Sequence, residues 1–262
     1  MIKAAFFDID GTLVSFKTHR MPESTKRAIA ELHRHGVLCF VASGRPKYQL
    51  QPCMRNGFEG FPGFDGFVTM NGSCCFDDGG VYFECPLDPA DVATVVSQVE
   101  DGLYDALALE RDRAYVSGHS AAVRAVERNA GLVYEEGDIR QALDAHVYQF
   151  CAFLPPEREH ILTDACSHVM ATRWIEHFCD VVPKGSSKSA GVRETLWHRG
   201  IAPEEAVAFG DGGNDADMLA FCGTGVAMGN ATDEAEAAAD YVTSSVDEDG
   251  VWNACRHLGL IG

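Results

Sequence analysis

Two carboxylates stand two residues apart, directly after a short apolar run near the start of the chain. Asp8 and Asp10 follow Ala4–Phe7 and precede Gly11. Residues two apart on a strand point to the same side, so both carboxylates should emerge together where the strand ends. Two such groups repel each other, and a bound divalent cation would remove that cost and keep one carboxylate ionised for attack. A solvated strand-to-turn junction is the alternative, because Asp and Gly are ordinary turn residues.

Other polar and charged side chains that could take part in the same chemistry also follow apolar runs or begin a helix. Ser43 ends the run 37–42, Asp211 and Asp215 follow the run 206–209, and Lys188 lies near the start of an expected helix. Carboxylates are hard oxygen ligands of the kind that Mg²⁺ prefers, while lysine and serine can hold phosphoryl oxygens. Because open α/β sheets bind ligands at the carboxyl ends of their strands, this set predicts metal-assisted phosphoryl transfer. An aspartate can itself be the nucleophile in such a reaction.

The elements that must position these groups alternate between strand and helix. Continuous apolar runs predict strands buried on both faces, at residues 3–8, 37–42, 66–70, 206–209, 225–228 and 241–243. Helical periodicity and end signals predict helices at residues 22–35, 186–199, from 216 onward, and 233–239. This rhythm predicts an α/β fold with a Rossmann-like parallel-sheet core.

The middle of the chain has a different pattern. It predicts helices at 89–100, 121–129 and 156–168, and strands at 105–110, 113–117, 147–154, 169–174 and 177–182. Strand pairs with helices indicate an α+β domain inserted into the α/β domain. We therefore expect a core formed by residues 1–82 and 184–262, and an inserted domain at 83–183.

Composition narrows the function classes. The net charge of −18 argues against nucleic acid or an anionic membrane as a partner, although a pocket can still bind a phosphorylated substrate. Hydrophobic residues make up 46% of the chain, which is typical of a folded globular protein. The ten cysteines form no CxxC pair, and neither a signal peptide nor a membrane span is visible. These features together predict a cytoplasmic protein.

Four segments resemble the motifs of the haloacid dehalogenase superfamily, in the same order. They are Asp8–Leu13, Val41–Arg45, Lys184–Lys188 and Gly210–Leu219. Their spacing is similar to that of the Cof-type phosphatase subfamily, in which a large α/β cap lies between the second and third motifs. The resemblance spans the whole core, and it implies that the inserted domain is a cap that selects the substrate.

The resemblance implies a role for each matching residue. Asp8 would attack phosphorus and ligate Mg²⁺. Asp10 would protonate the leaving oxygen and later take a proton from water, while its backbone carbonyl binds the metal. Ser43, with the turn at Gly44, and Lys188 would hold the phosphoryl oxygens, and Lys188 would also temper the charge of the nucleophile.

The remaining candidates complete the expected site. Asp211 would ligate Mg²⁺ directly, whereas Asp215 would act through a metal-bound water or position the lysine. Asn214 could contact the phosphate or the metal shell. Arg45 could contact the substrate or pair with an acidic side chain, and Asn71 lies in the expected turn before the cap.

The expected function is hydrolysis of a small phosphorylated metabolite, with Mg²⁺ as cofactor and an aspartyl-phosphate intermediate. Resemblance favours a sugar phosphate, while nucleotide, cofactor-precursor and phosphoglycolate-like substrates stay open. A phosphotransferase or phosphomutase is the first alternative, and a non-catalytic binding or regulatory module is the second; the intact charged set argues against the second. The third motif departs from the family at Ser189, where relatives usually carry glycine. Either a monomer or a homodimer is compatible with the sequence.

Overall fold

A sheet with the strand order β13-β12-β11-β1-β2-β3-β4-β5 forms the framework of one of two units in the computed structural model, which describes residues 1–130 and 132–262. This core unit contains Met1–Arg45, Gln49–Glu84 and Ser187–Gly262. The inserted unit contains Pro46–Tyr48 and Cys85–Ser186.

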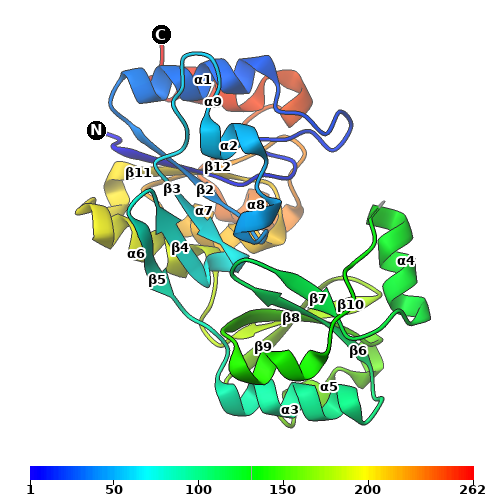
Figure 1. Cartoon of the computed structure of the whole chain (residues 1–262). Coiled ribbons are helices and arrows are strands. Elements are labelled where there is room, and N and C mark those ends of the chain that lie inside the picture. The colour runs from blue at the N-terminus through cyan, green and yellow to red at the C-terminus, as the bar shows by residue number, and fades with distance from the viewer. Residues whose placement is uncertain (131) are drawn as a thin grey trace. The chain divides into compact units, whose positions relative to one another are not determined.

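The strands of the core unit are short and mostly parallel (Figure 1). They are β1 (Ala4–Phe7), β2 (Leu38–Ala42), β3 (Gly66–Thr69), β4 (Cys74–Asp77), β5 (Gly80–Glu84), β11 (Ala206–Gly210), β12 (Thr224–Ala227) and β13 (Tyr241–Val242). Its α-helices are α1 (Glu23–Arg34), α2 (Pro52–Asn56), α6 (Lys188–Arg199), α7 (Ala216–Phe221), α8 (Asp233–Ala238) and α9 (Gly250–His257). Among the described strands of this sheet, only the pairs β3–β4 and β4–β5 are antiparallel.

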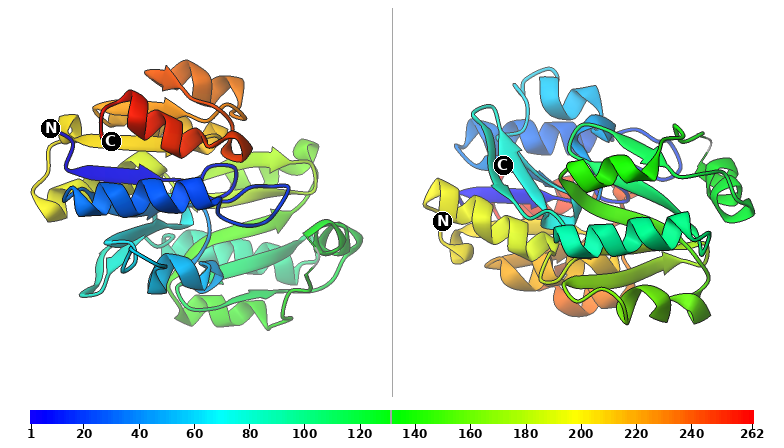
Figure 2. Two further views of the ribbon diagram at one scale, coloured as in Figure 1. Left: turned by 90° about the horizontal axis from the view of Figure 1, so that it is seen from above. Right: turned by 60° about the horizontal axis from the view of Figure 1, so that its bottom comes forward.

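Helices cover both faces of this sheet. On one face α1 and α9 lie side by side (Figure 2). On the other face Leu196 of α6 and Met218 of α7 belong to one buried cluster with Phe6 and Phe40. The rings of Phe6 and Phe40 stack with centroids 4.9 Å apart across β1 and β2. Burial on both faces explains why these strands read as continuous apolar runs rather than alternating ones.

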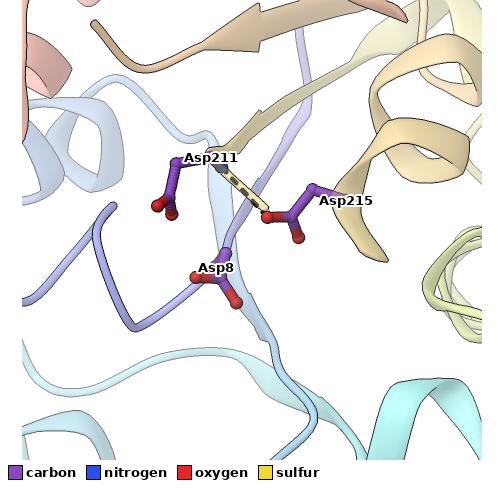
Figure 3. Close-up of side chains that lie close together, drawn as sticks. All are labelled: Asp8, Asp211 and Asp215. Carbon is purple, nitrogen blue, oxygen red and sulfur yellow. Dashed lines mark hydrogen bonds between the residues drawn. The ribbon is translucent and has the colours of Figure 1, made fainter. Parts of the chain in front are cut away.

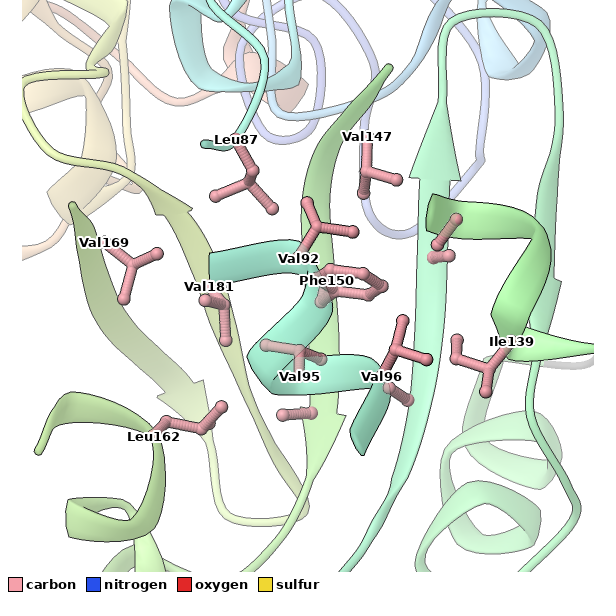
Figure 4. Close-up of a cluster of buried hydrophobic side chains, with 14 of the residues drawn as sticks. Leu87, Val92, Val95, Val96, Ile139, Val147, Phe150, Leu162, Val169 and Val181 are labelled. Atoms are coloured by element: carbon pink, nitrogen blue, oxygen red, sulfur yellow. The ribbon is translucent and has the colours of Figure 1, made fainter. Parts of the chain in front are cut away.

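The inserted unit has its own antiparallel sheet with the order β7-β6-β8-β10-β9. Its strands are β6 (Asp105–Glu110), β7 (Ala114–Val116), β8 (Val147–Phe153), β9 (Val169–Ile175) and β10 (Phe178–Pro183), and its α-helices are α3 (Pro89–Glu100), α4 (Ala121–Ala130) and α5 (His160–Thr163). Val92, Val95 and Val96 of α3 pack on Phe150 of β8, and Leu162 of α5 joins the same cluster (Figure 4). This unit therefore has a hydrophobic core of its own.

The predicted helix at 156–168 is wrong. The chain forms a single 3₁₀ turn at Pro156–Arg158, and the short helix α5 ends at Thr163. The buried carboxylate of Asp91 accepts hydrogen bonds from the backbone N–H groups of Ser167 and His168, at 2.9 and 2.8 Å. That tertiary contact satisfies backbone donors that a continued helix would have used, so it outweighs the local helical pattern.

Several elements were absent from the sequence prediction. They are α2, β4, β5 and α9, together with a 3₁₀ helix at Ile139–Asp144. The helices in the described parts of the chain are all too short or too polar to cross a membrane.

Candidate active site

Three neighbouring strands of the core sheet end at the candidate site. β1 pairs in parallel with β11 on one side and β2 on the other. Asp8 follows β1, Ser43 follows β2 and Asp211 follows β11. The parallel register therefore places all three residues at one edge of the sheet, as the sequence pattern predicted.

Lys188 connects two of the acidic residues. Its Nζ lies 2.5 Å from Oδ1 of Asp8 and 2.5 Å from Oδ1 of Asp215. The lysine is 1% exposed, and the two carboxylates are 7% and 1% exposed, so the whole charge triad is buried. Burial by itself would lower the pKa of Lys188, but Asp215 and Asp8 outweigh it and raise that pKa. Lys188 is therefore a fixed positive charge at this edge.

Asp211 is held by neutral donors. The hydroxyl of Thr12 donates to its Oδ1 at 2.9 Å, and the amide of Asn230 donates to its Oδ2 at 3.2 Å. The same amide nitrogen donates to the carbonyl of Gly11 at 2.9 Å. Asn230 thus links the loop after β1 to the loop after β11, and it fixes the orientation of the Asp211 carboxylate.

The carboxylates of Asp8, Asp211 and Asp215 face one another (Figure 3), with one oxygen from each lying within 4.8 Å of the other two. Burial raises the pKa of Asp8 to about 8; Lys188 opposes this shift and Asp215 adds to it. Burial likewise raises the pKa of Asp211 to about 7, although the hydrogen bond from Thr12 opposes it. Without a further positive charge, these acids are therefore costly to ionise.

A close approach of two glycines positions the start of α6. Gly72 lies in a turn after β3 with φ +90°, and a Cβ on it would meet the carbonyl oxygen of Ser187 at 1.9 Å. A Cβ on Gly191 would lie 2.8 Å from the Cα of Gly72. Only glycine fits at such contacts, so this pair lets the first turn of α6 approach the sheet and deliver Lys188 to its buried position.

Asp10 lies apart from the three clustered carboxylates. β1 ends at Phe7, and the guanidinium of Arg45 holds both oxygens of Asp10, with Nε at 2.7 Å and Nη2 at 2.6 Å. This bidentate ion pair is partly exposed, with side-chain exposures of 33% for Arg45 and 39% for Asp10. The structure thus places Arg45 on an acidic side chain, which is one of the two alternatives that the sequence left open.

The loops after β2 and β3 contribute further polar residues at the same edge of the sheet. Ser43 is 2% exposed, and its Oγ accepts the backbone N–H of Arg45 at 3.1 Å. The amide of Asn71 lies against Gly44, whose added Cβ would meet it at 3.1 Å. Asn214 donates to that amide oxygen at 3.2 Å. The predicted phosphate-binding residues in these loops therefore gather in one place.

The sequence did not predict the hydrogen bonds of Thr12 and Asn230 to Asp211. The short apolar strand before Asn230 and the Gly229-Asn230 dipeptide indicate only a strand followed by a turn. The contact with Asp211 spans 19 residues for Asn230 and 199 residues for Thr12. No local spacing encodes contacts of that length, so the fold was needed to find them.

The acidic set fits a divalent cation. Three carboxylates and one ammonium have a net charge of −2 when all are ionised, and each of these side chains is buried. Among the described residues, no protein donor reaches Oδ2 of Asp8, whereas Asp215 Oδ2 already accepts two backbone N–H groups at 3.0 and 2.8 Å. Hard oxygen ligands and an uncompensated double negative charge are the features of a Mg²⁺ site.

Known proteins resemble this chain along its whole length. A model of the family described as haloacid dehalogenase-like hydrolase matches residues 5–255. YkrA of Bacillus subtilis is 33% identical over 261 residues, which cover 99% of this chain and 98% of YkrA. The HMP-PP phosphatase of Serratia proteamaculans is 28% identical over 240 residues, which cover 88% of this chain and 85% of that protein. A solved structure described as a HAD subclass IIB sugar phosphatase has a TM-score of 0.87 and 36% identity, with 99% of this chain and 100% of that chain covered.

Proposed function

Because the chain belongs to the family of haloacid dehalogenase-like hydrolases, whose model matches residues 5–255, we propose that it is a Mg²⁺-dependent phosphatase of a small phosphorylated metabolite. The family and the α/β fold predicted from the sequence motifs are confirmed by the family model and by the sugar phosphatase structure. The observation that carries the proposal is the buried contact of Lys188 with Asp8 and Asp215, beside Asp211.

In the proposed reaction Asp8 is the nucleophile. Its Oδ1 faces the ammonium of Lys188, while its Oδ2 has no protein donor among the described residues and can approach phosphorus. The attack forms an aspartyl-phosphate and releases the alcohol, after which water attacks phosphorus and regenerates the carboxylate. Lys188 and the hydroxyl of Ser43 would hold the phosphoryl oxygens in place, which supplies fixed positive charge and a donor where negative charge is concentrated.

Asp10 is the proposed proton carrier. Its carboxylate is bound by Arg45 at 2.7 and 2.6 Å, so it must exchange this ion pair for the leaving oxygen. A carboxyl that gives a proton in the first step can take one from water in the second, because the two steps run in opposite senses. We propose that Arg45 holds Asp10 at the site between these steps.

The metal ligands in this proposal are Asp8, Asp211 and the backbone carbonyl of Asp10, with Asp215 acting through water or through Lys188. When bound, Mg²⁺ would neutralise the phosphoryl group and the buried carboxylates around it. Thr12 and Asn230 keep the Asp211 carboxylate oriented for this purpose.

For the substrate we propose a sugar phosphate, with the inserted unit as the part that selects it. The similarity to a sugar phosphatase over 99% of this chain supports this class. The 28% identity to an HMP-PP phosphatase makes a cofactor precursor the second class to examine. Both classes are small phosphorylated metabolites.

The test is phosphate release from a panel of sugar phosphates, nucleotides and cofactor precursors, measured with Mg²⁺ and with a chelator. We expect Mg²⁺-dependent turnover that Asp8→Asn abolishes. Asp78→Asn is the matched control, since Asp78 is an exposed carboxylate of the same unit and should leave turnover unchanged. Both variants should keep the fold of the parent protein, with an unchanged far-ultraviolet circular dichroism spectrum.

Turnover that persists in Asp8→Asn, or that is unaffected by the chelator, would contradict the proposed mechanism. Transfer of the phosphoryl group to an added alcohol, with little free phosphate, would replace hydrolysis with a phosphotransferase reaction on the same aspartate. The absence of turnover across the whole panel would contradict the proposed substrate class.

A further inference from the structure

Two hydroxyl groups flank Lys188 at the start of α6. The Oγ of Ser187 lies 3.0 Å from the Oγ of Ser189. Ser189 in turn donates its hydroxyl to Oδ2 of Asp217 at 2.6 Å, and its backbone N–H reaches the same oxygen at 3.2 Å. Asp217 belongs to α7, so this chain of hydrogen bonds joins the first turn of α6 to the first turn of α7.

The hydrogen bonds in this chain run in one direction. A carboxylate only accepts, so the proton of Ser189 is directed to Asp217 and the proton of Ser187 to the Oγ of Ser189. The Oγ of Ser187 then accepts the backbone N–H of Ala190 at 3.2 Å, as an N-cap residue does. The negative charge of Asp217 also lies at the positive end of the α6 dipole. Every donor and acceptor named here is therefore used consistently.

Adjacent residues of α6 thus contact acids two positions apart at the start of α7. Lys188 contacts Asp215, and Ser189 contacts Asp217. Asp215 is itself fixed by the backbone N–H groups of Asp211 and Gly212. The two contacts together hold the backbone of Lys188 against a segment that is already anchored at the site.

We propose that Ser189 and Asp217 are positioning residues for phosphoryl transfer, acting as a clamp on the backbone of Lys188. The inference rests on the proposed function for its kinetic consequence. The ammonium of Lys188 contacts Asp8 and Asp215 through a four-carbon side chain, so a shift of the Lys188 backbone changes how that side chain must extend to keep both contacts. A displacement of about 1 Å at a catalytic group can reduce a rate about a hundredfold. Loss of the clamp should therefore slow chemistry more than it weakens substrate binding.

Kinetics of four variants test the clamp: Ser189→Ala, Ser189→Thr, Asp217→Asn and the double variant Ser189→Ala/Asp217→Asn. We expect Ser189→Ala, which removes the hydrogen bond to Asp217, and Asp217→Asn, which removes the charge of its acceptor, each to lower kcat about tenfold, with KM within about twofold. Ser189→Thr keeps the hydroxyl and should restore most of kcat. The double variant should be little slower than either single variant, because both substitutions act on the same contact.

A matched control tests whether the loss of any serine–carboxylate hydrogen bond would lower kcat in the same way. Ser245 donates to Oε2 of Glu248 at 3.0 Å elsewhere in the core unit. Ser245→Ala should leave kcat unchanged. Equal losses in Ser245→Ala and Ser189→Ala, additive effects in the double variant, or an unchanged kcat in Ser189→Ala would each overturn the proposal.

A second measurement works even when no substrate is turned over. Melting temperatures of the metal-free protein are compared for Asp217→Asn, Lys188→Met and their combination. A clamp that acts on Lys188 predicts that the combined shift differs from the sum of the single shifts. Additive shifts would overturn the clamp, whereas a coupled shift without any turnover would support it and count only against the proposed phosphatase.

Discussion

The substitution Gly11→Ala tests how the loop after β1 and Asp211 fit together. Gly11 has φ +95°, and a Cβ added to it would lie 2.1 Å from Oδ2 and 2.6 Å from Cγ of Asp211. The Asp211 carboxylate cannot simply turn away, because Thr12 and Asn230 hold its two oxygens. Alanine at this position must therefore displace either the loop or the carboxylate.

The size of the effect follows from two contributions. A left-handed backbone costs a residue with a Cβ about 1–2 kcal/mol. An ordinary carbon contact begins near 3.4 Å, so the carboxylate must also retreat by about 1.3 Å, the difference between 3.4 and 2.1 Å. A displacement of this size at a catalytic group corresponds to a rate loss of about a hundredfold. We expect kcat/KM to fall by about that factor.

Gly36→Ala is the matched control. Gly36 has φ +79°, but among the described residues no heavy atom lies within 4 Å of its added Cβ. It should show the backbone strain alone, which lowers Tm by roughly 2–4 °C for each 1 kcal/mol in a protein of this size. Melting curves with Mg²⁺ and with chelator measure both effects, and phosphate release measures turnover. A normal Mg²⁺-induced rise of Tm in Gly11→Ala, with a loss of turnover no greater than in Gly36→Ala, would refute the reasoning.

Four further predictions concern charge and metal binding. Lys188→Met should lower the free energy of unfolding of the metal-free protein by about 3–5 kcal/mol in urea titrations, because it leaves two buried carboxylates without their cation; a loss below about 1 kcal/mol would contradict this. Asn230→Ala should weaken Mg²⁺ binding about tenfold in calorimetric titrations at unchanged fold, since it removes a donor to Asp211; unchanged affinity would count against that role. The Mg²⁺-induced rise of Tm should grow between pH 6 and pH 8, because burial raises the pKa of Asp8 to about 8 and of Asp211 to about 7, so bound protons compete with the metal at the lower pH. For the same reason the metal-free protein should lose stability as pH rises from the ordinary carboxyl pKa of 3.8 toward 8, since its folded state binds more protons than its unfolded state; a metal-free Tm that rises over this range would contradict the sign.

Local pattern predicted the buried elements of the fold better than the peripheral ones. Residues 3–8 were expected as a strand and form β1 at Ala4–Phe7, and the helix expected at 89–100 is α3 at Pro89–Glu100. β4 and β5 were missed because they lie at the end of the sheet, where pairing with a neighbour decides their structure. The helix expected at 156–168 failed for a related reason, since a tertiary contact to Asp91 redirects its second half.

For the candidate site, the sequence predicted which residues come together. It did not predict which of them form ion pairs or hydrogen bonds with one another. Motif order and the parallel-sheet rule together placed Asp8, Ser43 and Asp211 at one edge, and the structure brings them there. The spacing of Asp8 and Asp10 predicted only that both face the same way, whereas β1 ends before them and Arg45 binds Asp10. Such an ion pair joins residues that follow two different strands, and it forms only if their side chains are long enough to meet. The spacing of residues along one strand does not determine this.

The supply of hydrogen-bond donors supports different roles for three of the four aspartates at this edge of the sheet. Asp215 accepts from Lys188 and from two backbone N–H groups, so its oxygens are largely used and it suits a positioning role. Asp10 has both oxygens on one guanidinium, a partly exposed partner that can be exchanged, as a proton carrier requires. Asp8 has a single donor at Oδ1 among the described residues, and its Oδ2 keeps lone pairs that no protein group uses. A nucleophile needs an oxygen that no protein donor occupies, and in this set the donor pattern assigns that oxygen to Asp8.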